Sequence, residues 1–375
     1  MEYSIESAKE LVISAGKMLA KSGLIARTWG NISARISDDK FVVTPSGLAY
    51  ETLTPEQIVL VNIADCSYEG NIKPSSEKGI HADTYKLRPD VNFIIHTHQV
   101  MASVLSIEGK DIEVHNDTYK NILGNTVPCA AYGMSTTNKL RKRVAEIVSN
   151  YPECNAVLMK YHGTICMGNS LENTFEIAMI LEKMAQEVYD SVCGVNNKQI
   201  VQIPDYGKSR RRENAFTLEI NGMISDYNID GLSEGAPEAA LLHAEIYKSS
   251  NVTHIIHSKD EEVVKVSRKG QILRPLLDDF AQIVGVNIKT VKGGLKNIKV
   301  VAKELRIKNA VLLENEGALC TGITESDAEA ATMILRKGCV ADLYAAALNK
   351  TDRISTVDAY IQRIFYMTKY SKMKR

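Results

Sequence analysis

Residues 81–96 read HADTYKLRPDVNFIIH, and residues 243–257 read HAEIYKSSNVTHIIH. Both stretches carry His-Ala-acid, then Tyr-Lys, a polar loop and a closing Ile-Ile-His. The spacing of apolar residues predicts a helix, a short loop and a buried strand in each stretch. The same pattern twice in one chain indicates an internal duplication.

A second pair of stretches extends the repeat. Residues 155–168 (NAVLMKYHGTICMG) parallel residues 309–322 (NAVLLENEGALCTG), and each is followed by a long helical pattern, over 171–192 and 325–348. The copies are 154–162 residues apart, which is the size of a whole domain. Each copy therefore represents one domain.

The stretch between the copies is rich in turn-forming residues and contains the basic run Arg210–Arg212. That run fits either an anion-binding patch or a solvated linker, and three charges alone favour the linker. We predict a first domain over 1–195, which holds a metal site, a linker over 196–215, and a second domain over 216–375 without a metal site.

Composition narrows the class of protein. The 375 residues carry 45 basic and 45 acidic side chains, which argues against a bulk nucleic-acid binder or a polybasic membrane-surface protein. We expect no transmembrane segment and no secretory signal, because no apolar run is long enough and the first residues lack a basic stretch. Seven cysteines without a C-x-x-C pair indicate reduced thiols in a cytoplasmic protein.

Helical and strand-like patterns alternate in the first copy, which predicts an α/β layered domain, a sheet covered by helices. We expect helices over 5–21, 76–87, 98–106 and 138–149, and strands over 31–36, 41–44, 93–97, 156–159 and 164–167.

Histidines gather at the ends of these strands. His96 and His98 flank one residue at the end of an apolar strand, where side chains two residues apart share a face. His162 lies in a turn between two strands, and Glu77 offers a carboxylate. Three imidazoles and one carboxylate suit zinc or a similar divalent ion, although a His-x-His pair alone is often incidental.

The second copy has lost most of this set. His257 keeps the place of the first imidazole, whereas Lys259 and Glu316 replace the other two. We therefore predict one metal ion per chain, in the first domain, and a salt bridge between Lys259 and Glu316. His81 and His243 persist in both copies, so we interpret them as structural.

Three short polar loops remain in the first domain: Gly30–Ser33, Thr44–Gly47 and Ser75-Ser76. Small hydroxyl residues and backbone N–H groups near a helix start bind anions well. Each loop alone is equally a turn or a helix cap. Together with a metal site they suggest a phosphorylated substrate.

These motifs, in their order and rough spacing, resemble the class II aldolase/adducin family. That family includes L-fuculose-1-phosphate aldolase, L-ribulose-5-phosphate 4-epimerase, a sugar-phosphate dehydratase and the non-enzymatic adducin head. The resemblance covers residues 5–192 strongly, and the second domain resembles the same fold without the motifs. The motifs are Gly30–Ser33, Thr44–Gly47, Lys73–Glu77, His96–His98 and Tyr161–Gly163.

The resemblance implies an α/β/α fold with a largely antiparallel central sheet. It implies zinc, with manganese or cobalt as alternatives, held by His96, His98 and His162, and Glu77 as the catalytic acid/base. The residues that the resemblance places around the substrate phosphate are Asn31, Ser46, Gly47, Ser75 and Ser76.

Two details bear on the reaction. Glu77 resembles the aldolases, whereas His115-Asn116-Asp117 resembles the epimerase, whose aspartate is a catalytic acid/base; Asp117 is equally a loop cap, and Tyr119 lies near the place of an aldolase tyrosine. The leading prediction is a zinc-dependent aldolase that cleaves a small ketose 1-phosphate through a metal-stabilised enediolate. A pentulose-phosphate 4-epimerase or a dehydratase is the alternative, and an adducin-like binding protein is the alternative of another class.

The resemblance also implies active sites between the subunits of a four-membered ring, with a C-terminal tyrosine from the neighbour. Tyrosines that could play this part, and which we leave unassigned, are Tyr206, Tyr360, Tyr366 and Tyr370. We expect a homo-oligomer in which the second domain takes a ring position, so that two chains form a four-domain pseudo-ring. We expect a small phosphorylated sugar as the partner, and neither nucleic acid nor membrane.

Overall fold

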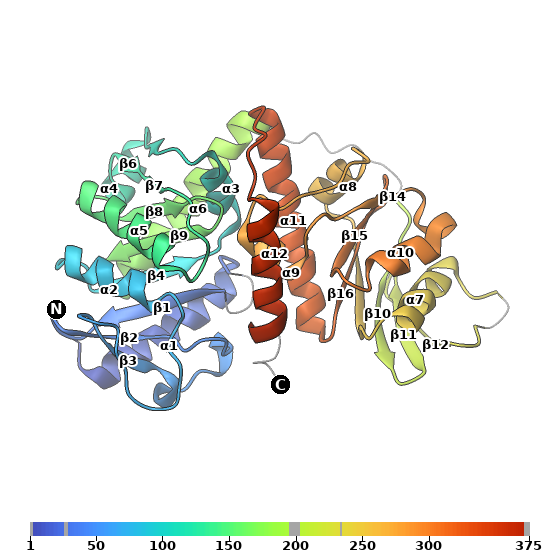
Figure 1. Ribbon diagram of the computed structural model, residues 1–375, viewed down its shortest axis with the longest axis horizontal. Coiled ribbons are helices and arrows are strands. Elements are labelled where there is room, and N and C mark those ends of the chain that lie inside the picture. Colours follow the sequence, from blue (N-terminus) through green and yellow to red (C-terminus); the bar gives the residue numbers. More distant parts are fainter. Residues whose placement is uncertain (1–2, 26–28, 195–202, 233–234, 371–375) are drawn as a thin grey trace. The chain divides into compact units, whose positions relative to one another are not determined.

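The computed structural model describes residues 3–25, 29–194, 203–232 and 235–370. The chain divides into two compact units, whose main parts are residues 1–194 and residues 195–368 (Figure 1). Each unit contains a seven-stranded sheet, with strand order β3-β2-β1-β4-β9-β8-β7 in the first and β12-β11-β10-β13-β16-β15-β14 in the second. The two orders correspond strand by strand, so the predicted duplication is confirmed.

The sheet of the first unit is antiparallel except where β7 pairs with β8. Its strands are β1 (Gly30–Arg35), β2 (Lys40–Val43), β3 (Val59–Asn62), β4 (Phe93–Thr97), β7 (Cys129–Ala130), β8 (Ala156–Met159) and β9 (Gly163–Gly168). A separate small ribbon joins β5 (Ile112–Glu113) to β6 (Thr126–Val127). The predicted α/β fold with a largely antiparallel sheet is confirmed.

Helices cover both faces of this sheet. The helices are α1 (Ile5–Ser22), α2 (Lys78–Leu87), α3 (Val100–Leu105), α4 (Asp117–Leu123), α5 (Asn138–Asn150) and α6 (Leu171–Cys193). Helices α2 and α5 pack against each other and bury one apolar cluster on their side of the sheet, while α1 packs on β1 and β2, and α6 on β4 and β9. Burial of these apolar side chains stabilises the layers.

The second unit repeats this plan. Its strands are β10 (Lys208–Arg212), β11 (Ala215–Ile220), β12 (Met223–Asn228), β13 (His254–Ser258), β14 (Thr290–Val291), β15 (Ala310–Leu313) and β16 (Gly317–Gly322). Its helices are α7 (Glu238–Ser249), α8 (Glu261–Ser267), α9 (Asp278–Ile283), α10 (Ile298–Glu304), α11 (Glu325–Ala347) and α12 (Thr356–Phe365). Helices α7 and α10 cover one face, and α8 and α11 cover the other.

The linker is expected over 196–215, but it ends before residue 208, because the basic run Arg210–Arg212 belongs to β10. Strand β10 pairs with β11 and β13 in the middle of the second sheet. Arg211 points inward and donates from Nη1 to the carbonyls of Tyr247 and Ser250, whereas Arg210 and Arg212 are exposed. Alternation along a strand explains this run, which the sequence pattern alone favoured as a loop.

Within the described ranges, no helix is both long and apolar enough to cross a bilayer.

Candidate active site

The register of three strands brings the predicted metal ligands to one edge of the first sheet. His96 on β4 lies opposite Asn31 on β1 and Ile165 on β9. Because both pairings are antiparallel, the end of β4 lies beside the beginnings of β1 and β9. His98, just after β4, and His162, just before β9, therefore meet at this edge.

The three imidazoles converge on one point. One ring nitrogen from each of His96, His98 and His162 lies within 4.8 Å of the others, and the Nε2 atoms of His96 and His98 are 3.2 Å apart. The Nδ1 of His96 lies 2.6 Å from the carbonyl oxygen of Thr164. Donation of Nδ1–H to that carbonyl leaves Nε2 as the basic nitrogen that faces the cluster. This donor set fits a divalent ion such as zinc.

Glu77 lies against this cluster and is buried. Its Oε2 is 3.1 Å from Nε2 of His96, and its Oε1 is 3.3 Å from Nε2 of His162. Burial by itself would raise the pKa of Glu77, but the neighbouring imidazoles of His162 and His96 outweigh burial and hold the pKa well below its usual range. The backbone N–H of Thr136 also donates to Oε1, at 3.2 Å.

The start of α2 sets the position of Glu77. Glu77 occupies the N-cap position, and its backbone N–H donates to Oγ of Ser75 at 3.2 Å. The N–H of Ser75 donates to the carbonyl of Thr44, and the N–H of Ser46 to the carbonyl of Lys73. Two of the predicted polar loops are therefore joined by backbone hydrogen bonds beside Glu77.

The third loop is tied to the same place. Oγ1 of Thr44 accepts from the N–H of Ile32 on β1 at 3.1 Å. Asn31 is buried, and its Oδ1 contacts Nε2 of His81. Gly47 has a φ of 79°, which glycine adopts without steric cost, whereas Ser76 is exposed. The structure thus brings Asn31 and the loops of Ser46 and Ser75 together near Glu77.

Two further contacts explain why His81 persists in both copies. Its Nδ1 lies 2.6 Å from Oγ of Ser33, which in turn lies 2.7 Å from the hydroxyl of Tyr85. Burial, with a smaller contribution from His96, lowers the pKa of His81 to about 3, so the ring is neutral. His81 holds Asn31 in the first copy and is not a member of the metal cluster.

Asp117 lies elsewhere. It is the first residue of α4, its side chain is 95% exposed, and it pairs with Lys120 at 3.4 Å. Asn116 caps this helix, and the hydroxyl of Tyr119 donates to Glu187 at 2.6 Å. Among the described residues, no contact joins Asp117 to the histidine cluster.

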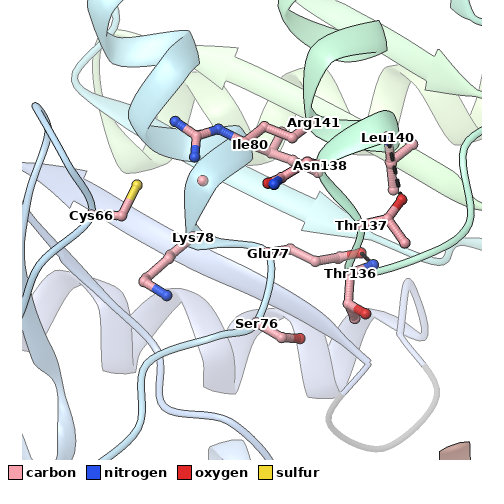
Figure 2. A pocket seen from close by; sticks show the side chains of 11 residues that line it. Cys66, Ser76, Glu77, Lys78, Ile80, Thr136, Thr137, Asn138, Leu140 and Arg141 are labelled. Carbon is pink, nitrogen blue, oxygen red and sulfur yellow. Dashed lines mark hydrogen bonds between the residues drawn. The ribbon is translucent and has the colours of Figure 1, made fainter.

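A small cavity lies beside Glu77, between the starts of α2 and α5. It has a volume of about 130 Å³, and its lining mixes apolar side chains with polar and charged ones, among them Ser76, Lys78 and Arg141. Figure 2 shows the Glu77 side chain directed toward Thr136, away from Lys78. Arg141 is bound to Asp83 by two hydrogen bonds of 2.6 and 2.7 Å.

The corresponding place in the second copy is filled by its own side chains. The hydroxyl of Tyr206 donates to Oε2 of Glu316 at 2.8 Å, and Nε2 of His257 lies 2.7 Å from the carbonyl of Glu316. Lys259 forms its salt bridge with Asp205, at 2.7 Å. The salt bridge predicted between Lys259 and Glu316 is therefore wrong, because Asp205 and Tyr206, which precede β10, each take one of these partners.

Sequence reasoning missed several groups that shape the first site. Trp29 packs edge-on against His98, with ring centroids 6.1 Å apart, and it is the single tryptophan of the chain directly before a predicted loop. That position was a usable signal. Thr136 and Thr164 contribute backbone atoms, and the position of a backbone atom cannot be inferred from the residue type.

Comparison with known proteins places this geometry. The model of the family described as "Class II Aldolase and Adducin N-terminal domain" matches residues 10–189 and again residues 203–342. The chain belongs to this family. Both copies match, so the second unit is a second member of the family, with Lys259 and Glu316 at the places of His98 and His162.

The relatives include enzymes with different reactions. The chain is 34% identical to the L-fuculose phosphate aldolase of Escherichia coli K12 over 168 residues, which are 45% of this chain and 76% of that protein. It is 35% identical to a 5-methylthioribulose-1-phosphate/5-deoxyribulose-1-phosphate aldolase of E. coli O45:K1, over 47% of this chain and 80% of that protein. A probable L-ribulose-5-phosphate 4-epimerase of Mycoplasma pneumoniae is 29% identical, over 48% and 81%.

Among solved structures, an L-fuculose 1-phosphate aldolase covers 54% of this chain and 93% of its own, with 27% identity and a TM-score of 0.46. The protein is an enzyme of the class II aldolase superfamily, and its relatives fit both an aldolase and an epimerase reaction.

Proposed function

We propose that the protein is a zinc-dependent aldolase that cleaves a small ketose 1-phosphate into dihydroxyacetone phosphate and an aldehyde. The observation that carries the proposal is the contact of the Glu77 carboxylate with the histidine cluster, at 3.1 and 3.3 Å. A carboxylate at the edge of a metal site is placed to move protons on a substrate that the metal holds. The two aldolase relatives support this choice.

His96, His98 and His162 would hold the ion. When bound, zinc supplies Lewis-acid stabilisation of the negative charge that develops on substrate oxygens. Zinc leads because three imidazoles with an open fourth position are typical of its catalytic sites, and manganese or cobalt fits the same donors.

Glu77 would shuttle one proton. As the bond between C3 and C4 breaks, the carboxylate takes the proton of the C4 hydroxyl, and the C4 carbon leaves as the aldehyde. The bonding electron pair passes toward the C2 oxygen and gives an enediolate. Glu77 then returns the proton to C3, which completes dihydroxyacetone phosphate and balances the reaction. A carboxylate form of Glu77 accepts the first proton, and its protonated form then donates to C3.

The joined loops of Thr44–Gly47 and Lys73–Ser76 would bind the phosphate, together with Asn31. Hydrogen bonds tie these loops to each other and to β1. An ordered anion site lets remote binding energy orient the reacting bond near Glu77.

A pentulose-phosphate 4-epimerase is the second proposal, supported by the Mycoplasma relative. An epimerase that breaks and remakes the bond needs an acid/base on each face of the carbonyl group. Asp117 would be the second, and its 95% exposed side chain has no contact with the cluster within the described part of the chain. The two aldolase relatives make the aldolase the first proposal.

The deciding experiment measures metal content and product on one sample purified without chelator. We expect about one zinc per chain and release of dihydroxyacetone phosphate from L-fuculose 1-phosphate, L-rhamnulose 1-phosphate or 5-deoxyribulose 1-phosphate. Zinc without release, but with conversion of L-ribulose 5-phosphate, would establish the epimerase instead. Protein that takes up no metal even after zinc is added would point to a binding protein.

Two further proposals concern the setting of the enzyme. The seven free cysteines fit a reducing compartment, and we propose the cytoplasm. We also propose a homo-oligomer in which two chains form a four-domain pseudo-ring. Light scattering tests this, and a monomer at working concentration would contradict it.

A further inference from the structure

We propose that Tyr161 is a positioning residue, which holds the loop of residues 131–137 so that the Thr136 N–H stays on the Glu77 carboxylate. The proposal rests on the assignment of Glu77 as the proton shuttle. It begins with the hydrogen bond between the Thr136 N–H and Oε1 of Glu77, at 3.2 Å. The carboxylate also contacts Nε2 of His96 and of His162, which a metal ion would engage, whereas the Thr136 N–H is not a metal ligand.

Thr136 is held in an unfavourable conformation. Its φ is 65°, in the left-handed region that β-branched residues rarely adopt. Strain of this kind persists where surrounding contacts enforce it. Beside Thr136 lies the cavity of about 130 Å³ seen in Figure 2, which gives the loop room to relax. Something must therefore hold the loop against Glu77.

Close contacts connect Tyr132 to Thr136 along the loop. A Cβ on Gly133 would lie 2.5 Å from the backbone nitrogen of Leu140, so the loop backbone is pressed against the first turn of α5. The N–H and the hydroxyl of Thr137 both donate to the carbonyl of Met134. A shift of Tyr132 is therefore passed on to Thr136.

Tyr161 anchors this loop at Tyr132. The two rings pack edge to face, with centroids 5.7 Å apart, and Tyr161 is 4% exposed. Tyr161 directly precedes the metal ligand His162, so one aromatic contact joins the ligand turn to the loop that holds Glu77. Edge-to-face pairs of this kind favour a defined geometry.

The second copy supplies the comparison. Tyr161 has a φ of 64°, and Asn315 at the equivalent position has a φ of 65°. The turns match, because the N–H groups of His162 and Glu316 donate to the carbonyls of Met159 and Leu313, both at 2.9 Å. Asparagine tolerates this conformation better than tyrosine. The copy with the histidine cluster thus keeps a tyrosine, although asparagine suits this turn better. The feature that Tyr161 has and Asn315 lacks is the aromatic ring.

The test compares Tyr161→Asn with Tyr161→Phe, and adds Tyr132→Ala, which lies outside the ligand turn. Hydrogen–deuterium exchange of the amides in 131–137 reports the loop directly, and NMR detection of proton exchange between dihydroxyacetone phosphate and D₂O reports the Glu77 step. We expect Tyr161→Asn and Tyr132→Ala each to raise amide exchange in this loop and to lower kcat for proton exchange about tenfold, or by about 1.4 kcal/mol of barrier.

In the same two variants, KM and metal content should stay within about twofold, while the melting temperature of Tyr161→Asn should fall, because the change removes a buried ring. Tyr161→Phe keeps the ring and should behave like the unmodified protein. Unchanged amide exchange in both Tyr161→Asn and Tyr132→Ala, or a Tyr161→Phe variant as impaired as Tyr161→Asn, would overturn the proposal. Unmodified protein without proton exchange would refute the proposed function instead, and amide exchange would still decide the role of Tyr161.

Discussion

The two copies share one sheet topology, yet the same edge of the sheet is used in opposite ways. In the first copy, three histidines and Glu77 face a common point where a metal ion fits. In the second, the hydroxyl of Tyr206 binds Glu316 and Asp205 binds Lys259, so polar side chains satisfy one another. The difference teaches that this edge must be filled, either by a ligand or by the chain itself, because buried polar groups without partners are costly.

The largest expected effect comes from replacing His98 in the first copy, compared with Lys259 at the equivalent position of the second. His98→Ala leaves two imidazoles, and we expect loss of more than about 90% of the metal and turnover at least about 10³-fold lower, because two imidazoles with one carboxylate hold zinc far more weakly. Lys259→Ala at the equivalent position should keep both. Plasma mass spectrometry of metal per chain checks this. Metal loss in Lys259→Ala would break the comparison.

The next effect distinguishes the catalytic carboxylate proposed at Glu77 from the structural carboxylate of Glu316. Glu77→Gln should keep the metal and lower turnover by about 10²–10⁴-fold, since an amide does not accept the proton. Glu316→Gln should leave turnover unchanged and lower the free energy of unfolding by about 1 kcal/mol, through a weaker bond from Tyr206. Steady-state kinetics and chemical denaturation measure the two outcomes. Full activity in Glu77→Gln would remove Glu77 from the mechanism.

Asp117 gives a smaller effect that sharpens the reaction type. For the aldolase we expect Asp117→Asn to change turnover by less than about twofold, because the side chain is exposed and pairs with Lys120. For an epimerase the same change should cost about 10²-fold or more, as expected for loss of an acid/base. Kinetics on a ketose 1-phosphate and on L-ribulose 5-phosphate distinguish the two cases.

The last effect, on stability rather than turnover, is a pH dependence in the second copy. Burial, then His257, lowers the pKa of His243 to about 3, so the folded state binds fewer protons than the unfolded state between about pH 3 and 6.5. Stability therefore falls as the pH falls below 6.5, at up to about 1.4 kcal/mol per pH unit.

Between pH 7.5 and 5.0 the unmodified protein should lose about 2 kcal/mol more than His243→Gln. Denaturation followed by circular dichroism measures this, and fluorescence of the single Trp29 reports the first unit separately. Equal losses in both proteins would show that His243 does not titrate on unfolding.

Much of the fold and of the metal cluster follows from sequence alone, for physical reasons. Strand periodicity and the duplication place His96, His98 and His162 at strand ends, and the loss of two of them in one copy marks them as a set. The Glu77 contact with Thr136 could not be predicted, because it uses a backbone N–H of a residue 59 positions away. The Lys259 partner was missed because Asp205 lies in a stretch whose composition resembles a linker.

The hydrogen-bonded groups Ser33–His81–Tyr85 and Ser209–His243–Tyr247 show almost the same geometry, with hydrogen bonds of 2.6 and 2.7 Å in both copies. The second copy keeps this group, although it has only one of the three histidines of the metal cluster. This hydrogen-bonded group therefore belongs to the architecture of the domain and does not depend on the histidine cluster. The positions where the copies differ, His98 against Lys259 and His162 against Glu316, are instead specific to the histidine cluster of the first copy.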